Sequence, residues 1–497
     1  MAWKSLLIRP YANYVARNVK RWSASAVADQ QKWMCALLHQ AQKTDFGKTH
    51  HFNKIKNHTD FKKNIPLRNY EDFQNWLDKI FKGEKDVLWP GQPLYFAKSS
   101  GTTSGAKYIP ISRDSINHHF LSAQSASLCF MAQSGNYNIM DGKMIFLSGS
   151  PELEMHYGIK TGRLSGIINH HIPGYLSRNR LPSPAVNRID DWEEKLEAIA
   201  NESIPLDLSL IGGIPPWIQM YFDLLQKKSK KSIAELFPNL KLLVHGGVNF
   251  KPYQKRLEQS LGRKINMIET YPASEAFIAF QEDYLSEGML LNTDAGIFYE
   301  FIPLEQVFEK NPKRLSLAEV DINRQYAIVI STNAGLWAYL LGDTIRFVSL
   351  NPHRIKVTGR IKHQLSAFGE HVIAEEVETA IKLACSEFDV LMEEFTVAPA
   401  MGDAQNLPCH EWVIAVSEKP KNEKAFAAYL DEQMYRQNIY YQDLVKGKVI
   451  QPLKVRWVKA KTFHNAMKKM GKLGGQNKAP RLMNDRSFVD LLIKNAQ

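Results

Sequence analysis

Between residues 94 and 357, short apolar runs of strand length alternate with segments that carry apolar residues at helical spacing. The apolar runs include 144–147, 208–211, 240–244 and 327–331, and the helical segments include 192–200, 216–226 and 253–261. Strands that alternate with helices are typical of α/β proteins, in which crossover helices pack on a parallel sheet. The sequence therefore predicts a largely parallel, doubly wound sheet over this region.

The pattern changes near residue 359. Beyond it, the sequence predicts helices at 373–383 and 423–437 and strands at 395–398, 412–416 and 455–459, which is the content of a compact α+β unit. Helical patterns also occupy much of 30–90. We therefore expect an α/β protein with a large N-terminal domain, residues 1–360 with a helical lead-in over 1–90, and a small mobile C-terminal α+β domain, residues 361–497. The hinge is expected near 359–362.

Composition excludes a disordered chain, because 44% of the 497 residues are apolar and only 23% are charged. Lysine and arginine number 63 against 51 acidic residues, a net charge of +12. This excess is spread along the chain, whereas a nucleic-acid binder gathers basic and aromatic side chains on one face. Only the first 22 residues and 454–478 approach that pattern. The charge excess alone fits a nucleic-acid partner, a membrane or anionic small substrates such as nucleotides, and its even spread leaves us expecting no nucleic-acid partner.

The first 28 residues contain five basic residues and no acidic one, with Trp3, Leu6, Leu7, Tyr14 and Trp22 interleaved. This composition suits a transit peptide or an interfacial helix, but also an amphipathic helix packed on its own domain. We favour the packed helix. The longest apolar runs have only strand length, so we expect no stable membrane association.

The four cysteines lie far apart without paired spacing. This argues against a disulfide framework or a zinc site and favours a reducing cytoplasm. The histidine pairs at 50–51, 118–119 and 170–171 are weak metal-site candidates, because adjacent side chains on a helix or strand point apart.

The segment from Lys98 to Lys107 reads Lys-Ser-Ser-Gly-Thr-Thr-Ser-Gly-Ala-Lys. Its two glycines let backbone N–H groups face an anion, its hydroxyls add donors, and Lys107 adds a positive charge. It is not a Walker A loop, because three residues rather than four separate the glycines and an alanine precedes the lysine. The segment is either a phosphate cradle or a Ser/Gly-rich surface loop.

Later segments add candidates in sequence order. The run 244–248 ends in two glycines, where backbone can approach a flat ring, although strand-ending glycines are common. Glu275 follows a predicted strand and is either a Mg²⁺ ligand beside a nucleotide or a solvated strand-end residue. Asp343, directly after Gly342, is either a turn former or an acceptor for ribose hydroxyls. The basic residues of 474–481 either reach an anionic site or form a solvated tail.

Taken in order, these segments resemble the acyl-adenylate-forming superfamily, and more narrowly the GH3 acyl-acid amido synthetases. The resemblance runs nearly end to end. It includes Thr-Asp-Phe-Gly at 44–47, Ile-Pro-Leu at 65–67 with Tyr-Glu-Asp-Phe at 70–73, the Ser/Gly segment with Tyr-Ile-Pro at 108–110, and the tail 476–481. The fuller matches in the lead-in and over 89–110 resemble the bacterial branch. Two departures are Ala276, where many relatives have glycine, and Ala338, where related bacterial sequences have arginine.

The resemblance implies an ATP- and Mg²⁺-dependent ligase that adenylates a small carboxylic acid and transfers the acyl group to an amine, with an amino acid as the expected acceptor. It implies a nucleotide site made of Ser99, Ser100, Gly101, Thr102, Thr103, Gly105, Lys107, Gly246, Gly247, Val248, Tyr271, Ser274, Asp343 and Arg360. In it, residues 99–107 hold phosphates, 246–248 and Tyr271 flank the adenine, and Asp343 binds the ribose. Glu275 is implied as the Mg²⁺ ligand, Lys478 as the catalytic lysine that reaches the α-phosphate, and Lys362 as the hinge.

Two other functions remain open from the sequence. One keeps the adenylate and uses coenzyme A or another thiol as the acceptor, and the other is a catalytically silent protein that binds a nucleotide or an acid. Retention of the phosphate segment, Glu275, Asp343 and Lys478 disfavours the silent protein. The sequence leaves the acid, the amine, the oligomeric state and the general base for the amine step open, and His171 and His245 are candidates for that base.

Overall fold

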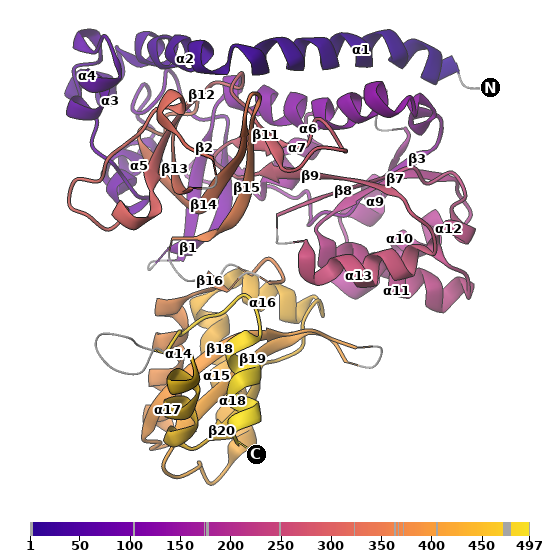
Figure 1. Ribbon diagram of the computed structural model, residues 1–497, viewed down its shortest axis with the longest axis vertical. Helices are drawn as coiled ribbons and strands as arrows, with labels where there is room; N and C mark the ends of the chain where they lie inside the picture. The colour runs from indigo at the N-terminus through magenta and orange to yellow at the C-terminus, as the bar shows by residue number, and fades with distance from the viewer. Residues whose placement is uncertain are drawn as a thin grey trace. The chain divides into compact units, whose positions relative to one another are not determined.

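The structure, a computed structural model, describes residues 3–102, 105–172, 174, 178–247, 250–322, 324–361, 364–365, 367–370, 372–403, 406–470 and 479–496. The chain divides into two compact units (Figure 1). The larger comprises residues up to 99, 107–190 and 194–361, and the smaller comprises 100–106, 191–193 and 362–497. The predicted α/β fold, with a large N-terminal domain and a smaller C-terminal domain, is confirmed.

The helical lead-in is present in the larger unit. Its elements are α1 (Trp3–Ala24), α2 (Ala26–Ala41), α3 (Asp45–Thr49), η1 (Phe52–Lys54), α4 (His58–Asn64), η2 (Glu71–Phe73) and α5 (Gln74–Phe81). Side chains cap two of these short helices: Thr44 accepts from the backbone N–H of Gly47 and Asn57 from that of Asp60. These caps explain why the periodic pattern breaks into short helices.

Eleven of the described strands form one sheet, in the order β12-β13-β14-β15-β11-β10-β9-β8-β7-β3-β6. The last five in this order pair in parallel: β9 (Asn266–Pro272), β8 (Leu242–Gly246), β7 (Leu208–Gly213), β3 (Lys143–Phe146) and β6 (Arg180–Leu181). Helices connect these strands, as predicted: α9 (Pro184–Asn187), α10 (Trp192–Ser203), α11 (Pro215–Ser229), α12 (Ile233–Leu236) and α13 (Lys251–Leu261).

The other six strands pair antiparallel, which corrects the expectation of a largely parallel sheet. They are β10 (Phe277–Phe280), β11 (Met289–Leu291), β12 (Ile297–Pro303), β13 (Gln325–Thr332), β14 (Tyr339–Leu350) and β15 (His353–Arg360). Every residue of β12 and seven of the eight in β13 are buried. Such continuously buried strands look like parallel strands in a sequence, yet among the described residues of 277–360 no α-helix separates them, as a parallel crossover usually requires.

A second sheet in this region has the order β2-β1-β5-β4 among the described strands. Its strands are β1 (Tyr95–Thr102), β2 (Gly105–Ile111), β4 (Glu154–His156) and β5 (Ile159–Gly162), and β1 pairs with β5 in parallel. Three further elements lie near these sheets in sequence: α6 (Arg113–Ser134), η3 (Tyr137–Asp141) and α7 (Leu164–Asn169). Two 3-10 turns, η4 (Leu304–Gln306) and η5 (Leu317–Glu319), complete the larger unit.

The N-terminal helix α1 packs on its own domain, as the sequence analysis favoured. Ala12, Val19 and Trp22 are buried in a cluster with residues of α6 and the parallel strands. The Trp22 ring meets Phe280 edge-on at 6.4 Å between centroids. Figure 1 shows α1 along the outer edge of the larger unit, beside α6. The described helices include none with the length and apolar character needed to cross a bilayer.

The smaller unit contains the predicted α+β elements. Its three-stranded sheet has the order β18-β19-β20, with β18 (Met392–Ala400), β19 (Cys409–Val416) and β20 (Lys454–Val458). Its other elements are β16 (Gln364–Leu365), β17 (Val372–Ile373), α14 (Ala374–Glu387), α15 (Glu423–Gln437), α16 (Ile439–Lys446), α17 (Ala460–Lys469) and α18 (Ser487–Ala496). Packing of α17 and α18 buries Phe463 and Phe488 against the sheet.

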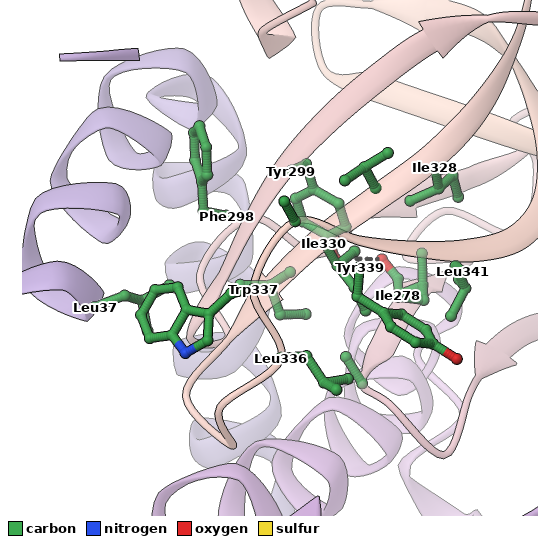
Figure 2. Close-up of a cluster of buried hydrophobic side chains, with 14 of the residues drawn as sticks. Leu37, Ile278, Phe298, Tyr299, Ile328, Ile330, Leu336, Trp337, Tyr339 and Leu341 are labelled. Carbon is green, nitrogen blue, oxygen red and sulfur yellow. Dashed lines mark hydrogen bonds between the residues drawn. The ribbon is translucent and has the colours of Figure 1, made fainter. Parts of the chain in front are cut away.

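The core of the larger unit contains an aromatic cluster around Trp337 (Figure 2). Trp337 is fully buried, and its indole N–H donates to the Leu88 carbonyl at 3.1 Å. The rings of Phe46 and Phe52 lie 6.1 and 4.6 Å from it. The lead-in is therefore part of the same core as the antiparallel strands.

A buried ionic group also joins the lead-in to the sheet. Glu300, on β12, is 1% exposed and pairs with Arg314, which also donates to the Ile65 carbonyl at 2.6 Å. The His58 imidazole Nε2 lies 2.8 Å from the second Glu300 oxygen. Burial by itself raises the pKa of Glu300, but the hydrogen bonds from His58 and Arg314 and the charge of Arg314 outweigh it, so this pKa lies below its ordinary value of 4.5.

Candidate nucleotide site

Four predicted site residues lie together in the larger unit: Lys107, Tyr271, Glu275 and Asp343. The Tyr271 hydroxyl donates to Asp343 Oδ2. The charges of Lys107 and Asp343 both act on the Glu275 carboxyl group. The four come from β2, the end of β9, the turn after β9, and β14. Strand pairing therefore gathers residues that are up to 236 positions apart in the chain.

A tight turn positions Glu275. Residues 273–276 join β9 to the antiparallel β10, and the backbone N–H of Ala273 donates to the Ala276 carbonyl at 2.9 Å. Ser274 is half-buried in this turn, and Glu275 is 8% exposed. Ala276, which completes this turn, is buried.

Glu275 is a buried carboxyl group whose surroundings favour its neutral form. Burial is the largest influence and raises the pKa of Glu275, and the nearby Asp343 carboxylate raises it further. The positive charge of Lys107 and a hydrogen bond from Tyr339 act in the opposite direction without reversing the shift. A bound cation would relieve this unfavourable environment.

The sequence analysis did not identify Tyr339, which connects Lys107 and Glu275. Its hydroxyl donates to Glu275 Oε1 at 3.2 Å and accepts from Lys107 Nζ at 3.4 Å. Burial and the adjacent carboxylate raise the pKa of Tyr339 well above its ordinary value. Figure 2 shows its ring beside Ile278 and Leu341, with the hydroxyl directed away from Trp337. Its position four residues before Asp343, in the same predicted apolar segment, could have indicated it.

Tyr70 is a second residue that the sequence analysis did not assign to the site. The Lys107 ammonium lies 5.6 Å from the centre of its ring and 6.0 Å from that of Tyr339, within the range of a cation–π interaction. The Tyr70 hydroxyl accepts from the Tyr108 backbone N–H at 2.8 Å, and burial raises its pKa to about 12. Lys107 therefore lies between two aromatic rings.

Ala338, directly before Tyr339, has a left-handed backbone conformation. Ala338 has φ 48° and is fully buried, a conformation that costs about 1–3 kcal/mol for a residue other than glycine. Its N–H donates to Ser331 Oγ at 2.8 Å, and its carbonyl accepts from the Arg68 N–H at 3.0 Å. The Leu340 N–H returns a bond to the Arg68 carbonyl at 2.7 Å. The lead-in thus holds the strand that carries Tyr339.

The Ser/Gly segment forms the ends of two strands rather than a long loop. Ser99, Ser100, Gly101 and Thr102 belong to β1, and Gly105 and Lys107 belong to β2. Thr103 lies outside the described residues. The described part of this segment is therefore strand backbone, and Lys107 lies on β2.

Gly246 is required by packing. A side chain at this position would lie 2.0 Å from the Thr270 carbonyl oxygen of the neighbouring β9. Gly247 has φ +80°, in the left-handed region that favours glycine. The close neighbour of Gly246 is therefore the backbone of β9. Val248 lies outside the described residues.

The remaining predicted residues are less completely placed. Arg360 ends β15, and its backbone lies opposite Asp343 in the pairing with β14. Lys362 and Lys478 lie outside the described residues.

The two candidate bases have different surroundings. His171 Nε2 is 3.0 Å from the Tyr95 hydroxyl. His245 stacks on Phe250 with 4.0 Å between ring centres, and burial lowers its pKa to about 4. No cluster of three or more potential metal ligands occurs within the part of the chain that the structure describes.

Comparison with known proteins identifies the family. Three GH3 family models match the chain: the N-terminal domain at residues 15–196, the central domain at 290–360 and the C-terminal domain at 375–487. Together they cover more than half of its length. The chain belongs to the GH3 family.

Relatives of this GH3 chain include plant enzymes. Indole-3-acetic acid-amido synthetase GH3.4 of Arabidopsis thaliana is 22% identical, over 93% of this chain and 90% of the relative. Jasmonoyl-L-amino acid synthetase JAR4 of Nicotiana attenuata is 20% identical, over 64% of this chain and 66% of the relative. The solved structure of GH3.15 acyl acid amido synthetase matches with a TM-score of 0.61 at 16% identity, covering 97% of this chain and 96% of that one. This structural match shows a shared fold.

Proposed function

We propose that this GH3 chain is an ATP-dependent acyl-acid amido synthetase. The observation that carries the proposal is the group of half-buried Lys107 with buried Tyr339, Glu275, Asp343 and Tyr271, which combines one cation with two carboxylates. The relatives named above support it, because their names describe the joining of a carboxylic acid to an amine. The expected substrates are a small carboxylic acid and an amino acid, and the expected compartment is the cytoplasm.

The nucleotide would bind beside this buried group. Asp343 would accept hydrogen bonds from the ribose hydroxyls, and the Tyr271 ring with residues 246–248 would flank the adenine. Residues 99–107, with the Lys107 ammonium, would hold the phosphates, with Ser274 and Arg360 beside the nucleotide. Lys478 would reach the α-phosphate, and Lys362 would serve as the hinge between residues 1–360 and 361–497.

The chemistry of Glu275 fits a magnesium ion held together with nucleotide phosphates. Mg²⁺ prefers oxygen ligands and is commonly bound by one or two carboxylates plus substrate phosphates. Glu275 is such a carboxylate, and its burial, with the Asp343 carboxylate nearby, raises its pKa. When bound, the ion would neutralise negative charge that develops on the departing pyrophosphate.

The reaction would proceed in two steps. A carboxylate oxygen of the acid attacks the α-phosphorus of ATP, the bond to the pyrophosphate breaks, and an acyl-adenylate forms. The amine then attacks the acyl carbon, AMP leaves with the electrons of the carbon–oxygen bond, and the amine loses a proton. The chain would contribute by holding the reacting groups in line and by placing Lys107 and Lys478 against the negative charge.

The test is pyrophosphate release from ATP and Mg²⁺ across a panel of aromatic and aliphatic acids, with and without mixed amino acids. Acid-dependent release, lost in Lys478→Ala and followed by an amide detected by mass spectrometry, would support the proposal. A thioester formed only with coenzyme A would instead indicate the thiol acceptor. ATP binding without release for any acid would favour a silent binding protein, and absence of ATP binding would contradict adenylation.

Removing the Tyr339 hydroxyl is expected to lower pyrophosphate release by about 10- to 100-fold, because a hydrogen bond to a charged group contributes about 1.5–3 kcal/mol. Tyr339→Phe keeps the buried ring and removes the hydroxyl that bonds Glu275 and Lys107. Tyr326→Phe is the matched control, because Tyr326 is equally buried and its hydroxyl accepts from the Asp321 N–H at 2.8 Å. Equal rates in the two variants would show that Tyr339 has no special role.

A further inference from the structure

The outward face of α1 is apolar where a surface helix would normally be polar. Leu6, Leu7 and Tyr14 are 73%, 66% and 65% exposed, and Tyr11, whose hydroxyl donates to Gln124 of α6 at 3.3 Å, borders them at 41%. The opposite face holds the helix in place, because Ala12, Val19 and Trp22 are buried against the domain. Polar contacts add to this attachment, since Lys4 donates to Asn179 at 3.1 Å and Tyr137 to Asn13 at 3.2 Å. The helix is therefore held on the domain by its inward face, while the apolar side chains of its outward face stay in contact with solvent.

Basic residues continue this apolar strip along the same side of the helix. Leu7, Tyr14 and Arg21 are spaced by seven residues, and positions seven apart on a helix differ in direction by only about 20°. Arg17, Lys20 and Arg21 are all exposed, and no acidic residue occurs in the first 28 positions. The first acid that follows, Asp29, pairs with Lys32 at 2.8 Å. The strip thus has an apolar N-terminal half and a basic C-terminal half.

We infer that this strip of α1, Leu6 to Arg21, docks reversibly on an anionic membrane surface. Exposed leucine and tyrosine side chains enter the boundary between headgroups and acyl chains, while arginine and lysine attract anionic lipids. A second copy of this chain fits less well, because the strip would bring its arginines against basic or apolar residues with no carboxylate to pair them. A nucleic acid would use the basic half and leave the leucines exposed.

The test is sedimentation of the full-length protein with phosphatidylcholine vesicles, with or without about 30% phosphatidylserine. We expect at least about tenfold stronger binding to the anionic vesicles, and loss of most of it between about 0.1 and 0.5 M salt. Leu6→Ser/Leu7→Ser/Tyr14→Ser and Arg17→Gln/Lys20→Gln/Arg21→Gln should each weaken vesicle binding about tenfold or more. The matched control is Leu285→Ser/Phe308→Ser, which removes residues that are 76% and 81% exposed elsewhere on the larger unit.

Three outcomes would overturn the inference. They are absence of vesicle binding by the wild type, equal binding to neutral vesicles, and equal loss of binding in the control variant. A dimer in sedimentation equilibrium that the apolar triple variant converts to a monomer would assign the strip to an interface between copies instead. Circular dichroism of each variant separates loss of docking from unfolding of α1.

Discussion

Glu275→Gln is expected to lower acid-dependent pyrophosphate release by about 100- to 1,000-fold, the usual cost of losing one charge contact in a transition state. Glutamine keeps the size of the side chain and can retain the hydrogen bond with Tyr339. The substitution therefore removes the negative charge while leaving the turn at 273–276 intact. Because Glu275 is buried beside Lys107 and Asp343, no solvent-exposed group can readily replace that charge.

The measurement is initial-rate pyrophosphate release at several magnesium concentrations, together with ATP binding by calorimetry. We expect the rate to fall and the magnesium dependence to weaken. Glu269→Gln is the matched control, because Glu269 lies on β9, the strand that precedes the turn of Glu275, and burial also raises its pKa. A Glu275→Gln enzyme within about threefold of the wild type would remove this carboxylate from the proposed mechanism.

Glu300→Ala is expected to destabilise the larger unit by about 3–5 kcal/mol, because it leaves the Arg314 guanidinium buried without its partner. Arg314 is 6% exposed, so water cannot readily solvate the stranded charge. The measurement is urea unfolding followed by circular dichroism at pH 7. Glu305→Ala is the control, since Glu305 pairs with Arg324 on the surface, and no measurable change is expected there.

A double substitution, Glu300→Leu/Arg314→Met, distinguishes the contribution of the two charges to stability from the contribution of side-chain packing. Removing both charges should destabilise the unit less than Glu300→Ala alone, because no buried charge then remains unpaired. If the double variant is instead the less stable of the two, the ion pair itself contributes net stability.

The stabilisation from Glu300 should also depend on pH. Its pKa in the folded protein lies below the ordinary 4.5, so unfolding is linked to proton uptake at acidic pH. The contribution is fully present above about pH 5 and is lost as the pH falls from about 4.5 through the lower folded pKa. The difference in stability between wild type and Glu300→Ala, measured from pH 7 down to pH 3.5, should therefore shrink below about pH 4.5.

The chain's local patterns determined much of the fold. Hydrophobic periodicity predicted helix α15 at its observed bounds, 423–437, and predicted strand β19 at 412–416, where the structure has Cys409–Val416. The pattern is informative because side-chain direction repeats with the backbone of each element. The candidate residues Tyr271, Glu275 and Asp343 were indicated by their position at strand ends and beside glycine. The family, too, was evident in the order of short motifs.

Tertiary structure decided the strand directions and the contacts of the site. Strands such as β12 are buried on both faces, so their sequence does not reveal whether they run parallel or antiparallel. The bond from Tyr339 to Glu275 joins residues 64 positions apart, and the bond from the Tyr271 hydroxyl to Asp343 spans 72. The apolar outward face of α1 became evident only once Val19 and Trp22 were seen to occupy its inward face. Local sequence determines which side chains share a face of an element, whereas only packing between elements determines what each face contacts.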